Sequence, residues 1–213
     1  MPEIIVATGG ERSAVQRALD GLVEEGFVER SPARRYHLGV EAMHLGHATM
    51  LRSPLVSTYR LALQRIARTT GHTAFIGVRM GDFILCLHCE EGSTPMRARL
   101  TRPGELKPLG TTAGSLALMA NMRERDLHTI YQRHVGAYEA AGLDFAALCQ
   151  HVRHVRRNGY GVIRNSVSEG VTGIGVGLGG TEPFATVSMA GPTSLLGPKR
   201  LAELYAELRS IAD

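Results

Sequence analysis

The chain has 213 residues, with 24 lysines and arginines against 20 acidic residues, nine histidines and three cysteines. Its hydrophobic content of 44 % excludes a disordered, collagenous or coiled-coil protein, and its length allows one large domain or two small ones. The odd, low cysteine count argues against a disulfide scaffold, no apolar stretch is long enough to span a bilayer, and the first residues lack the basic start of a signal peptide. A cytoplasmic protein with no membrane partner is therefore expected.

The first forty residues predict a helix followed by a β-hairpin. Residues 11–25 carry apolar side chains at helical spacing, and Gly26 lies where a helix-terminating glycine is expected. Residues 27–30 and 34–38 predict two short strands joined by a turn. This is the order of elements in a winged helix-turn-helix, whose helix enters the DNA major groove. Any small helix–hairpin unit would give the same pattern, so the pattern alone leaves DNA binding open.

The net charge does not decide between these two interpretations. The first fifty residues hold five arginines against seven acidic residues, and the basic excess lies in the rest of the chain. Arginine is nevertheless suited to phosphate oxygens and guanine edges. Arg12 and Arg17 on the predicted helix, and Arg34 and Arg35 on the predicted hairpin, are therefore candidate DNA-binding residues.

The remainder of the chain predicts mixed helices and strands. Helices are expected at residues 40–51, 54–70, 111–122, 123–134, 145–158 and 199–212, and strands at 74–79, 83–89, 96–100, 161–166, 173–178 and 184–190. The inner face of the helix at 54–70 is assigned to Leu55, Leu61, Ala62, Ile66 and Ala67. Because helices and strands do not alternate strictly, an α+β fold with an antiparallel sheet flanked by helices is favoured.

Two motifs suggest chemistry but favour ordinary packing. Cys86 and Cys89 have the spacing of a metal knuckle, yet a zinc site needs four ligands. On a regular strand Cys86 and His88 would share one face and Cys89 the other. The glycines of 173–177 resemble a dinucleotide loop, but they open no helix and predict a strand with close backbone approaches. With no nucleophile elbow, Walker loop or carboxylate pair, we expect no catalytic residue, cofactor or metal, and no enzyme.

Three clusters of small polar residues suggest a ligand pocket. Residues 108–115 place glycines and hydroxyl groups before a predicted buried helix, and two further clusters lie at 165–168 and 186–190. Free backbone N–H groups at the start of a helix bind carboxylates. The clusters could line a pocket for a small anion, or the small residues could merely allow tight packing. The pattern alone leaves both interpretations open.

Several short stretches follow one another in an order that resembles a known family. They are residues 13–22 (SAVQRALDGL), 26–28 (GFV), 36–39 (YHLG), 108–109, 112–114, 159–160, 170–171 and 185–192 (ATVSMAGP). Their spacing resembles the recognition helix, wing, pocket helix and C-terminal signature of IclR-type transcriptional regulators. The resemblance covers nearly the whole chain. It implies a winged helix-turn-helix, a linking helix and a GAF-like effector domain, in dimers or tetramers that bind double-stranded operator DNA and respond to a small, often carboxylated, metabolite.

The resemblance also implies roles for individual residues. DNA would be contacted by Arg12, Ser13, Gln16 and Arg17, and the effector pocket would be lined by Thr111, Thr112, Ala113, Gly114, Gly177, Ser188 and Ala190. Where the family usually has an acidic residue this chain has Ser166, and where a cysteine is frequent it has Gly173. The pocket is therefore expected to be less acidic than usual, with Ser166 in its wall. Arg164, or the N–H groups at 112–114, would hold a ligand carboxylate.

The resemblance divides the chain into three parts. Residues 1–39 correspond to the winged helix-turn-helix, 40–52 to the linking helix and 53–213 to the effector domain. Residues 4–9 resemble the end of the motif's second helix, so the head in this sequence is expected to be incomplete. Two functions remain: a DNA-binding regulator controlled by a small metabolite, and a small-molecule sensor that has lost DNA binding and acts through protein partners.

Overall fold

The computed structural model describes residues 1–52, 55–94, 101–165, 169–179 and 184–212. The chain divides into two compact units, Met1–Leu55 and Val56–Asp213.

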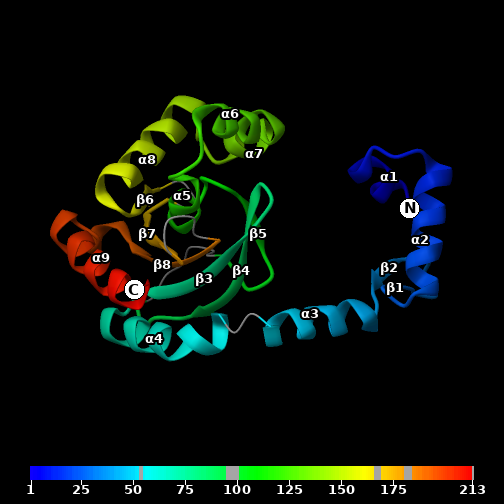
Figure 1. The fold of residues 1–213 in the computed structure, drawn as a ribbon, viewed down its shortest axis with the longest axis horizontal. Coiled ribbons are helices and arrows are strands. Elements are labelled where there is room, and N and C mark those ends of the chain that lie inside the picture. Colours follow the sequence, from blue (N-terminus) through cyan, green and yellow to red (C-terminus); the bar gives the residue numbers. More distant parts are fainter. Residues whose placement is uncertain (53–54, 95–100, 166–168, 180–183, 213) are drawn as a thin grey trace. The chain divides into compact units, whose positions relative to one another are not determined.

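The first unit contains helices and one small hairpin (Figure 1). Its elements are α1 (Pro2–Thr8), α2 (Arg12–Glu24), β1 (Val28–Arg30), β2 (Tyr36–Leu38) and α3 (Val40–Arg52). Helix α2 buries Val15 and Leu19, as its apolar spacing predicts. Strands β1 and β2 pair antiparallel, and Gly26 adopts a φ of +76°, which glycine tolerates at the end of a helix. The predicted helix–hairpin order is thus present.

The second unit is built on one six-stranded antiparallel sheet. Its spatial order is β5-β4-β3-β8-β7-β6. The strands are β3 (Thr73–Met80), β4 (Phe83–Glu90), β5 (Leu106–Pro108), β6 (Gly161–Arg164), β7 (Val171–Leu178) and β8 (Ala185–Pro192). The expected α+β fold with an antiparallel sheet flanked by helices is confirmed.

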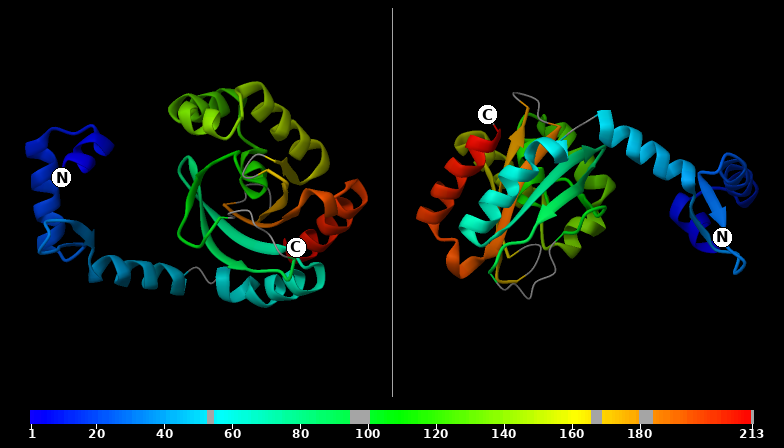
Figure 2. Two further views of the ribbon diagram at one scale, coloured as in Figure 1. Left: turned by 180° about the vertical axis from the view of Figure 1, so that it is seen from behind. Right: turned by 90° about the horizontal axis from the view of Figure 1, so that it is seen from below.

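Helices cover both faces of this sheet (Figures 1 and 2). Helices α4 and α9 lie along one face, and α5 to α8 lie over the other. Their bounds are α4 (Leu55–Thr70), α5 (Ala113–Met119), α6 (Glu124–Arg133), α7 (Val135–Ala140), α8 (Phe145–Asn158) and α9 (Pro198–Ala212), with a short 3₁₀ turn at Thr193–Leu195. All seven residues of α5 are buried, because this helix lies between the sheet and α8.

The side-chain alternation of β7 explains how α5 comes so close to the sheet. Residues 173, 175 and 177 are glycines on the face toward α5, whereas Ile174, Val176 and Leu178 are buried on the opposite face. A Cβ atom built on Gly175 would lie 2.6 Å from the backbone nitrogen of Gly114. The glycines therefore let two backbones approach, as the sequence predicts.

Three details of the second unit differ from the sequence analysis. The inner face assigned to α4 is wrong at Leu61, which is 76 % exposed; Leu63, Ile66 and Ala67 are buried instead. Leu61 lies two residues from Leu63, and that spacing places two side chains on opposite sides of a helix. Strand β5 and helix α7 were not expected, and the strand expected at 96–100 lies outside the described residues.

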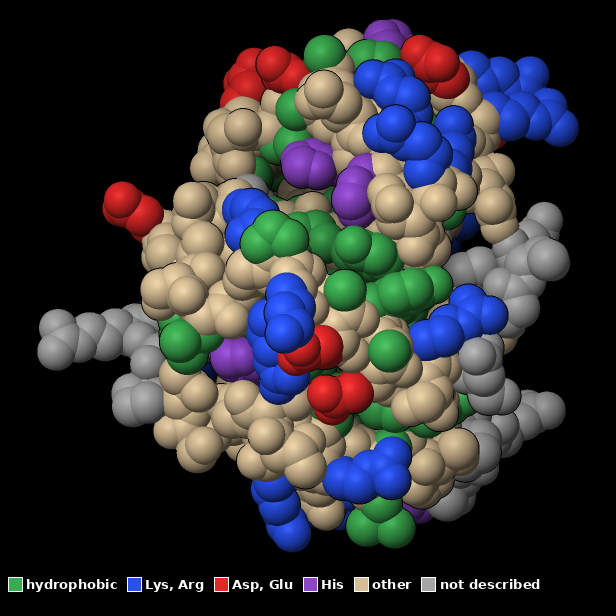
Figure 3. Space-filling view, turned by 90° about the vertical axis from the view of Figure 1, so that its left-hand side faces the viewer, with side chains coloured by type: hydrophobic (Ala, Val, Ile, Leu, Met, Phe, Trp, Pro, Cys, Tyr) green, Lys and Arg blue, Asp and Glu red, His purple; other side chains and the backbone are tan. Residues whose placement is uncertain are grey.

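Apolar side chains also reach the surface of the protein. Figure 3 shows hydrophobic side chains in a band across one face, with lysines and arginines around it. Phe184 and Leu195 are each more than half exposed. More than half of a folded protein's accessible surface is apolar, so this band does not by itself mark a binding surface.

Candidate functional site

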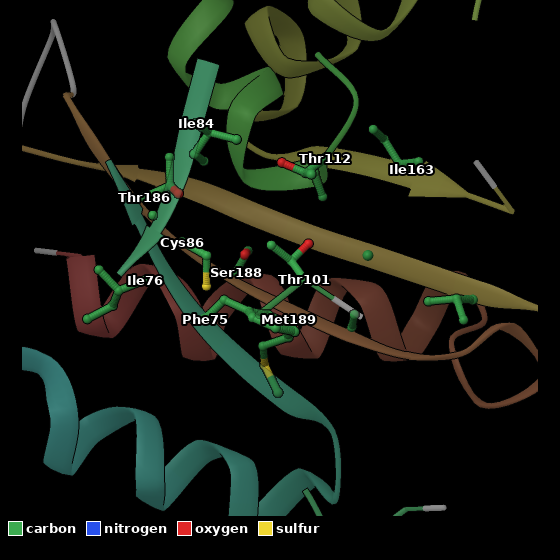
Figure 4. A pocket seen from close by; sticks show the side chains of 15 residues that line it. Phe75, Ile76, Ile84, Cys86, Thr101, Thr112, Ile163, Thr186, Ser188 and Met189 are labelled. Carbon is green, nitrogen blue, oxygen red and sulfur yellow. The ribbon is translucent and has the colours of Figure 1, made fainter. Parts of the chain in front are cut away.

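The second unit contains a partly open cavity of about 80 Å³. It is bounded by five strands of the sheet and by the start of α5 (Figure 4). The residues that line it are Phe75, Ile76, Gly77, Ile84, Cys86, Thr101, Thr112, Ala113, Ile163, Val171, Gly173, Thr186, Ser188, Met189 and Ala190. The lining is thus mostly apolar, with a few hydroxyl groups, which is the usual character of a small-molecule site.

Strand register places the hydroxyl-bearing residues of β8 on the face toward α5. Thr186 pairs with Gly77 of β3 and Gly177 of β7, and Ser188 pairs with Phe75 and Gly175. Paired residues project to the same side of a sheet. Gly175 and Gly177 place no side chain beside the two hydroxyl groups on the β7 side, whereas on the β3 side Phe75 lies beside Ser188 and the Ile84 side chain fills the space beside Gly77.

The start of α5 satisfies two of its backbone N–H groups through its own side chains. Thr112 and Ser115 form a reciprocal capping box, in which Thr112 Oγ1 accepts from the backbone nitrogen of Ser115 and Ser115 Oγ accepts from that of Thr112. Ser115 Oγ also accepts from the nitrogen of Gly110, at 2.9 Å. The N–H group of Thr112, which the sequence analysis offers to a ligand carboxylate, is therefore already engaged.

The described part of the cavity wall carries no charge. None of the lining residues that the structure describes is charged. Burial raises the pKa of the Cys86 thiol to about 12, and the nearby Cys89 adds to that shift. The thiol therefore stays protonated at neutral pH and donates only a long bond, 3.6 Å, to the carbonyl of His88.

One fully buried polar atom in the described cavity wall has no partner. Thr186 is fully buried, and its Oγ1 forms no hydrogen bond within the described part of the chain. Sequence reasoning missed this residue and selected Ser188 from the same strand. The only sequence signal was the hydroxyl at position 186 in the run ATVSM, and its isolation depends on glycines that come from other strands.

The expected effector residues fall into several groups. Thr112, Ala113, Ser188 and Ala190 line the cavity. Three more lie next to it without lining it: Gly114 packs against Thr186, Gly177 pairs with Thr186, and the Thr111 hydroxyl donates to the Pro108 carbonyl at 2.7 Å.

The two remaining effector candidates are not among the described residues that line the cavity. Arg164 is exposed, does not line the cavity, and donates from Nη1 to the carbonyl of Leu196 at 3.2 Å. Ser166 lies outside the described residues.

The expected face assignment of the cysteine motif is wrong. The register between β3 and β4 shifts after Ile76, so that His88 pairs with Ile76 and Cys86 with Gly77. The extra residue, Leu87, puts Cys86 and Cys89 on one face and His88 on the other. His88 Nε2 lies 2.8 Å from Glu90 Oε1. Within the described ranges, no group of three or more His, Cys, Asp or Glu side chains has the arrangement of a metal site.

In the first unit, the candidate DNA-binding residues of α2 lie close together in sequence at its start. Arg12, Ser13 and Arg17 are exposed, and Gln16 is partly exposed. Gln16 Nε2 donates to Asp20 at 2.7 Å, and the Ser13 hydroxyl donates to Glu11 at 3.0 Å.

The two hairpin arginines lie at the turn between β1 and β2. Arg34 and Arg35 are exposed, and Arg34 has a φ of +57°, a strained value for a residue other than glycine. The side chain of Ser31 holds the turn by accepting from the nitrogen of Arg35 at 3.2 Å. In the described part of the chain, no ion pair occupies Arg12, Arg17, Arg34 or Arg35. Their guanidinium groups thus face solvent.

Among the described helices, none is both long enough and apolar enough to cross a membrane.

Comparisons with known proteins agree on one family. The family model described as "Bacterial transcriptional regulator IclR C-terminal" matches residues 47–213. The HTH-type transcriptional regulator BhcR of Paracoccus denitrificans is 31 % identical over 198 residues, which are 90 % of this chain and 70 % of that protein. A putative IclR transcriptional regulator from a Silicibacter species has a TM-score of 0.83 at 22 % identity, over 99 % of this chain and 85 % of that one. An IclR family regulator from Brucella abortus has a TM-score of 0.79 at 20 % identity, over 99 % and 81 %.

Proposed function

We propose, from the premise that this chain belongs to the IclR family of bacterial transcriptional regulators, that its first unit binds operator DNA and that the cavity of its second unit binds a small metabolite. The observation that supports this proposal is the presence of both parts in one chain. A helix–hairpin unit with five exposed arginines precedes a domain with a mostly apolar cavity.

The DNA-binding part of the proposal depends on α2 and the hairpin. Arg12, Ser13, Gln16 and Arg17 would face the major groove, while Arg34 and Arg35 would contact the backbone from the hairpin turn. Arginines without acidic partners are free to neutralise phosphates and to read guanine edges. The domain boundaries proposed are 1–39 for the DNA-binding head, 40–52 for the linking helix and 53–213 for the effector domain.

The effector-binding part of the proposal depends on the cavity. Thr112, Ala113, Ser188 and Ala190 would contact the metabolite directly, with Thr111, Gly114 and Gly177 shaping the wall. For regulation, the metabolite must favour one arrangement of the DNA-binding heads in a dimer or tetramer. Because α3 leads from the head toward α4, the coupling would pass along this helix.

Fluorescence anisotropy with DNA from upstream of the chain's own gene tests the DNA-binding part. We expect binding that is stronger than to a shuffled duplex and that weakens steeply between 50 and 200 mM salt, because phosphate contacts release counterions. Arg17→Ala should weaken binding and lower the slope of log K against log salt by about 1. The control Arg65→Ala removes an exposed arginine of α4 and should leave that slope unchanged.

Two results would contradict this part of the proposal. Equal affinity for the shuffled duplex would remove specific recognition, and absence of binding at 50 mM salt would remove DNA as a partner of this chain. The effector domain would then support a sensor that acts through protein partners.

A further inference from the structure

The hydroxyl group of Thr186 is an unused hydrogen-bonding group inside the cavity wall. The residue is fully buried, and its Oγ1 has no partner among the residues described. Native proteins pair nearly all buried polar groups, because an unpaired one forfeits its bond to water without replacement. Figure 4 shows Thr186, Ser188, Cys86 and Thr112 around one space. The hydroxyl is therefore positioned to bond a ligand atom in that space.

The surroundings of Thr186 are closely packed. Gly177 has no side chain beside it, but the end of the Ile84 side chain fills the space beside Gly77, where a Cβ atom would lie 2.7 Å from Ile84 Cδ1. On the helix side, a Cβ atom built on Gly114 would lie 2.7 Å from Thr186 Oγ1, so the α5 backbone packs directly against the hydroxyl. A ligand in the cavity, whose wall includes both Ile84 and Thr186, therefore reaches the hydroxyl by displacing the end of the Ile84 side chain.

Two other polar groups at this end of the cavity have partners. Thr112 Oγ1 lies 3.0 Å from Ser115 Oγ and accepts from the nitrogen of Ser115. The Cys86 thiol is neutral and donates to the His88 carbonyl. On strand β8, Thr186 and Ser188, whose hydroxyl forms no hydrogen bond with the described residues, are thus the groups on which a polar ligand atom would depend.

Charge limits which ligand atom can bond to Thr186, and the size of the cavity limits the ligand as a whole. A carboxylate placed against Thr186 would be buried with no charged lining residue described to compensate it, at a large desolvation cost. An uncharged hydroxyl or carbonyl oxygen carries no such cost and matches a threonine hydroxyl, which both donates and accepts. A cavity of about 80 Å³ has space for roughly five to eight water-sized groups.

Building on the proposed function, we infer that Thr186 determines effector specificity by hydrogen-bonding an uncharged oxygen of a compact ligand. The ligand class is a short alcohol, ketone or aldehyde, or a larger metabolite that presents such a group at this end. Any carboxylate of the effector would lie away from Thr186.

Four probes of similar size test this inference by NMR titration of the full, ¹⁵N-labelled chain: cyclopentanol, cyclopentanone, cyclopentane and cyclopentanecarboxylate. We expect the alcohol and the ketone to bind more tightly than the carboxylate. Thr186→Val replaces the hydroxyl with a methyl group of similar volume, and it should weaken binding of the alcohol and the ketone by roughly three- to tenfold, the loss of one hydrogen bond. Cyclopentane should bind the variant at least as well as the unmodified chain.

Thr172→Val is the matched control. Thr172 is also a fully buried threonine, on the opposite face of neighbouring β7, but its Oγ1 is bonded to Thr193 Oγ1 at 2.9 Å. This variant should lose stability, because it leaves Thr193 without that partner, and should keep its affinity for the probes. Thr186→Val should show the reverse: unchanged or greater stability, and weaker binding of the oxygen-bearing probes.

Each remaining outcome counts against a specific statement. Equal affinity of Thr186→Val and the unmodified chain for cyclopentanol would overturn the role of Thr186 and leave the effector site standing. Preference for the carboxylate would overturn the uncharged ligand class alone. Failure of all four probes to shift resonances of cavity residues would reject this inference together with the cavity as the effector site.

Discussion

Asp82 ties the turn between β3 and β4 to the junction of α6 and α7. Its Oδ2 lies 3.0 Å from His134 Nε2 and 3.3 Å from Arg133 Nη1. Burial acts to raise the pKa of this carboxyl group, but the hydrogen bonds from His134 and Arg133 outweigh burial, and the pKa falls below its ordinary value of 3.8. A carboxyl group with a lowered native pKa stabilises the fold above about pH 4, and that contribution is lost as the pH falls through the native pKa.

Asp82→Asn should therefore destabilise the protein in a pH-dependent way. We expect a loss of about 1 kcal/mol at pH 7, because the partly exposed Arg133 contributes little and the bond to His134 carries most of the effect. The difference should shrink as the pH falls below about 4, because the contribution of the ionised Asp82 is lost as the pH falls through its lowered pKa. Urea unfolding at pH 7, 5 and 3 measures both quantities. Glu139→Gln, an exposed change on α7, serves as the control, and an equal loss at all three pH values would contradict the argument.

The contrast between Ser188 and Thr186 shows what can be learned about the site from sequence. Hydroxyl residues in the run 186–190, together with the resemblance to a family, were sufficient to predict a pocket that includes Ser188 and Ala190. Thr186 was not selected, because its isolation depends on Gly77 and Gly177. Gly77 is more than a hundred positions away in sequence and Gly177 is nearly ten, and the strand register brings both beside Thr186. The role expected for Arg164 was based on proximity in sequence to Ser166, whereas the fold turns its guanidinium toward the Leu196 carbonyl.

At the scale of elements, α5 and β7 fit together through their glycines. A Cβ atom on Gly175 would lie 2.6 and 2.7 Å from backbone atoms of Gly114, which cannot move without displacing the helix. Gly175→Ala should therefore cost at least roughly 2 kcal/mol, as overpacking of a core does. It should also abolish probe binding, since α5 forms one wall of the cavity.

Gly136→Ala is the matched control for this substitution. Gly136 lies within α7, and a Cβ atom there would meet nothing within 4 Å. Alanine is the better helix former, so stability should rise by roughly 0.5 kcal/mol. Urea unfolding of both variants compares the two effects directly. Similar stability changes for the two substitutions would show that the close approach of α5 to β7 is not a real constraint.

The bounds of a helix or strand were predictable from sequence where neighbouring residues set its ends. Helix α8 was expected at 145–158 and is observed there, because the Asp144 side chain accepts from the nitrogen of Ala147 at 2.7 Å and Gly159 ends the helix with a φ of +82°. Strand β5, only three residues long, exists through its pairing with β4, a contact between segments about twenty residues apart. Nothing in the sequence indicates the register shift in β4, and the face predicted for His88 was wrong for that reason.

At the scale of the whole molecule, the cavity and its supporting core belong to the second unit. The buried cluster around α5 is formed by Ile84, Leu109, Leu116, Ala117, Leu118, Met119, Leu127, Ile130, Tyr131, Tyr138, Leu143, Leu148, Val152, Val155 and Ile163. The Tyr138 hydroxyl donates to the carbonyl of Leu109 at 2.6 Å within the same unit. The first unit contributes none of these residues, so ligand binding and DNA binding should be separable functions.

A fragment that begins at Val56 and ends at Asp213 should accordingly fold alone and retain the effector site. A unit of this length buries enough apolar surface for independent stability. We expect one cooperative transition in urea and the same NMR affinity for cyclopentanol as the full chain, with no DNA binding in the anisotropy assay. A fragment that unfolds without cooperativity would show that the second unit needs residues 1–55 for its stability. A folded fragment that loses the probe would instead place part of the binding site, or its preorganisation, in the first unit.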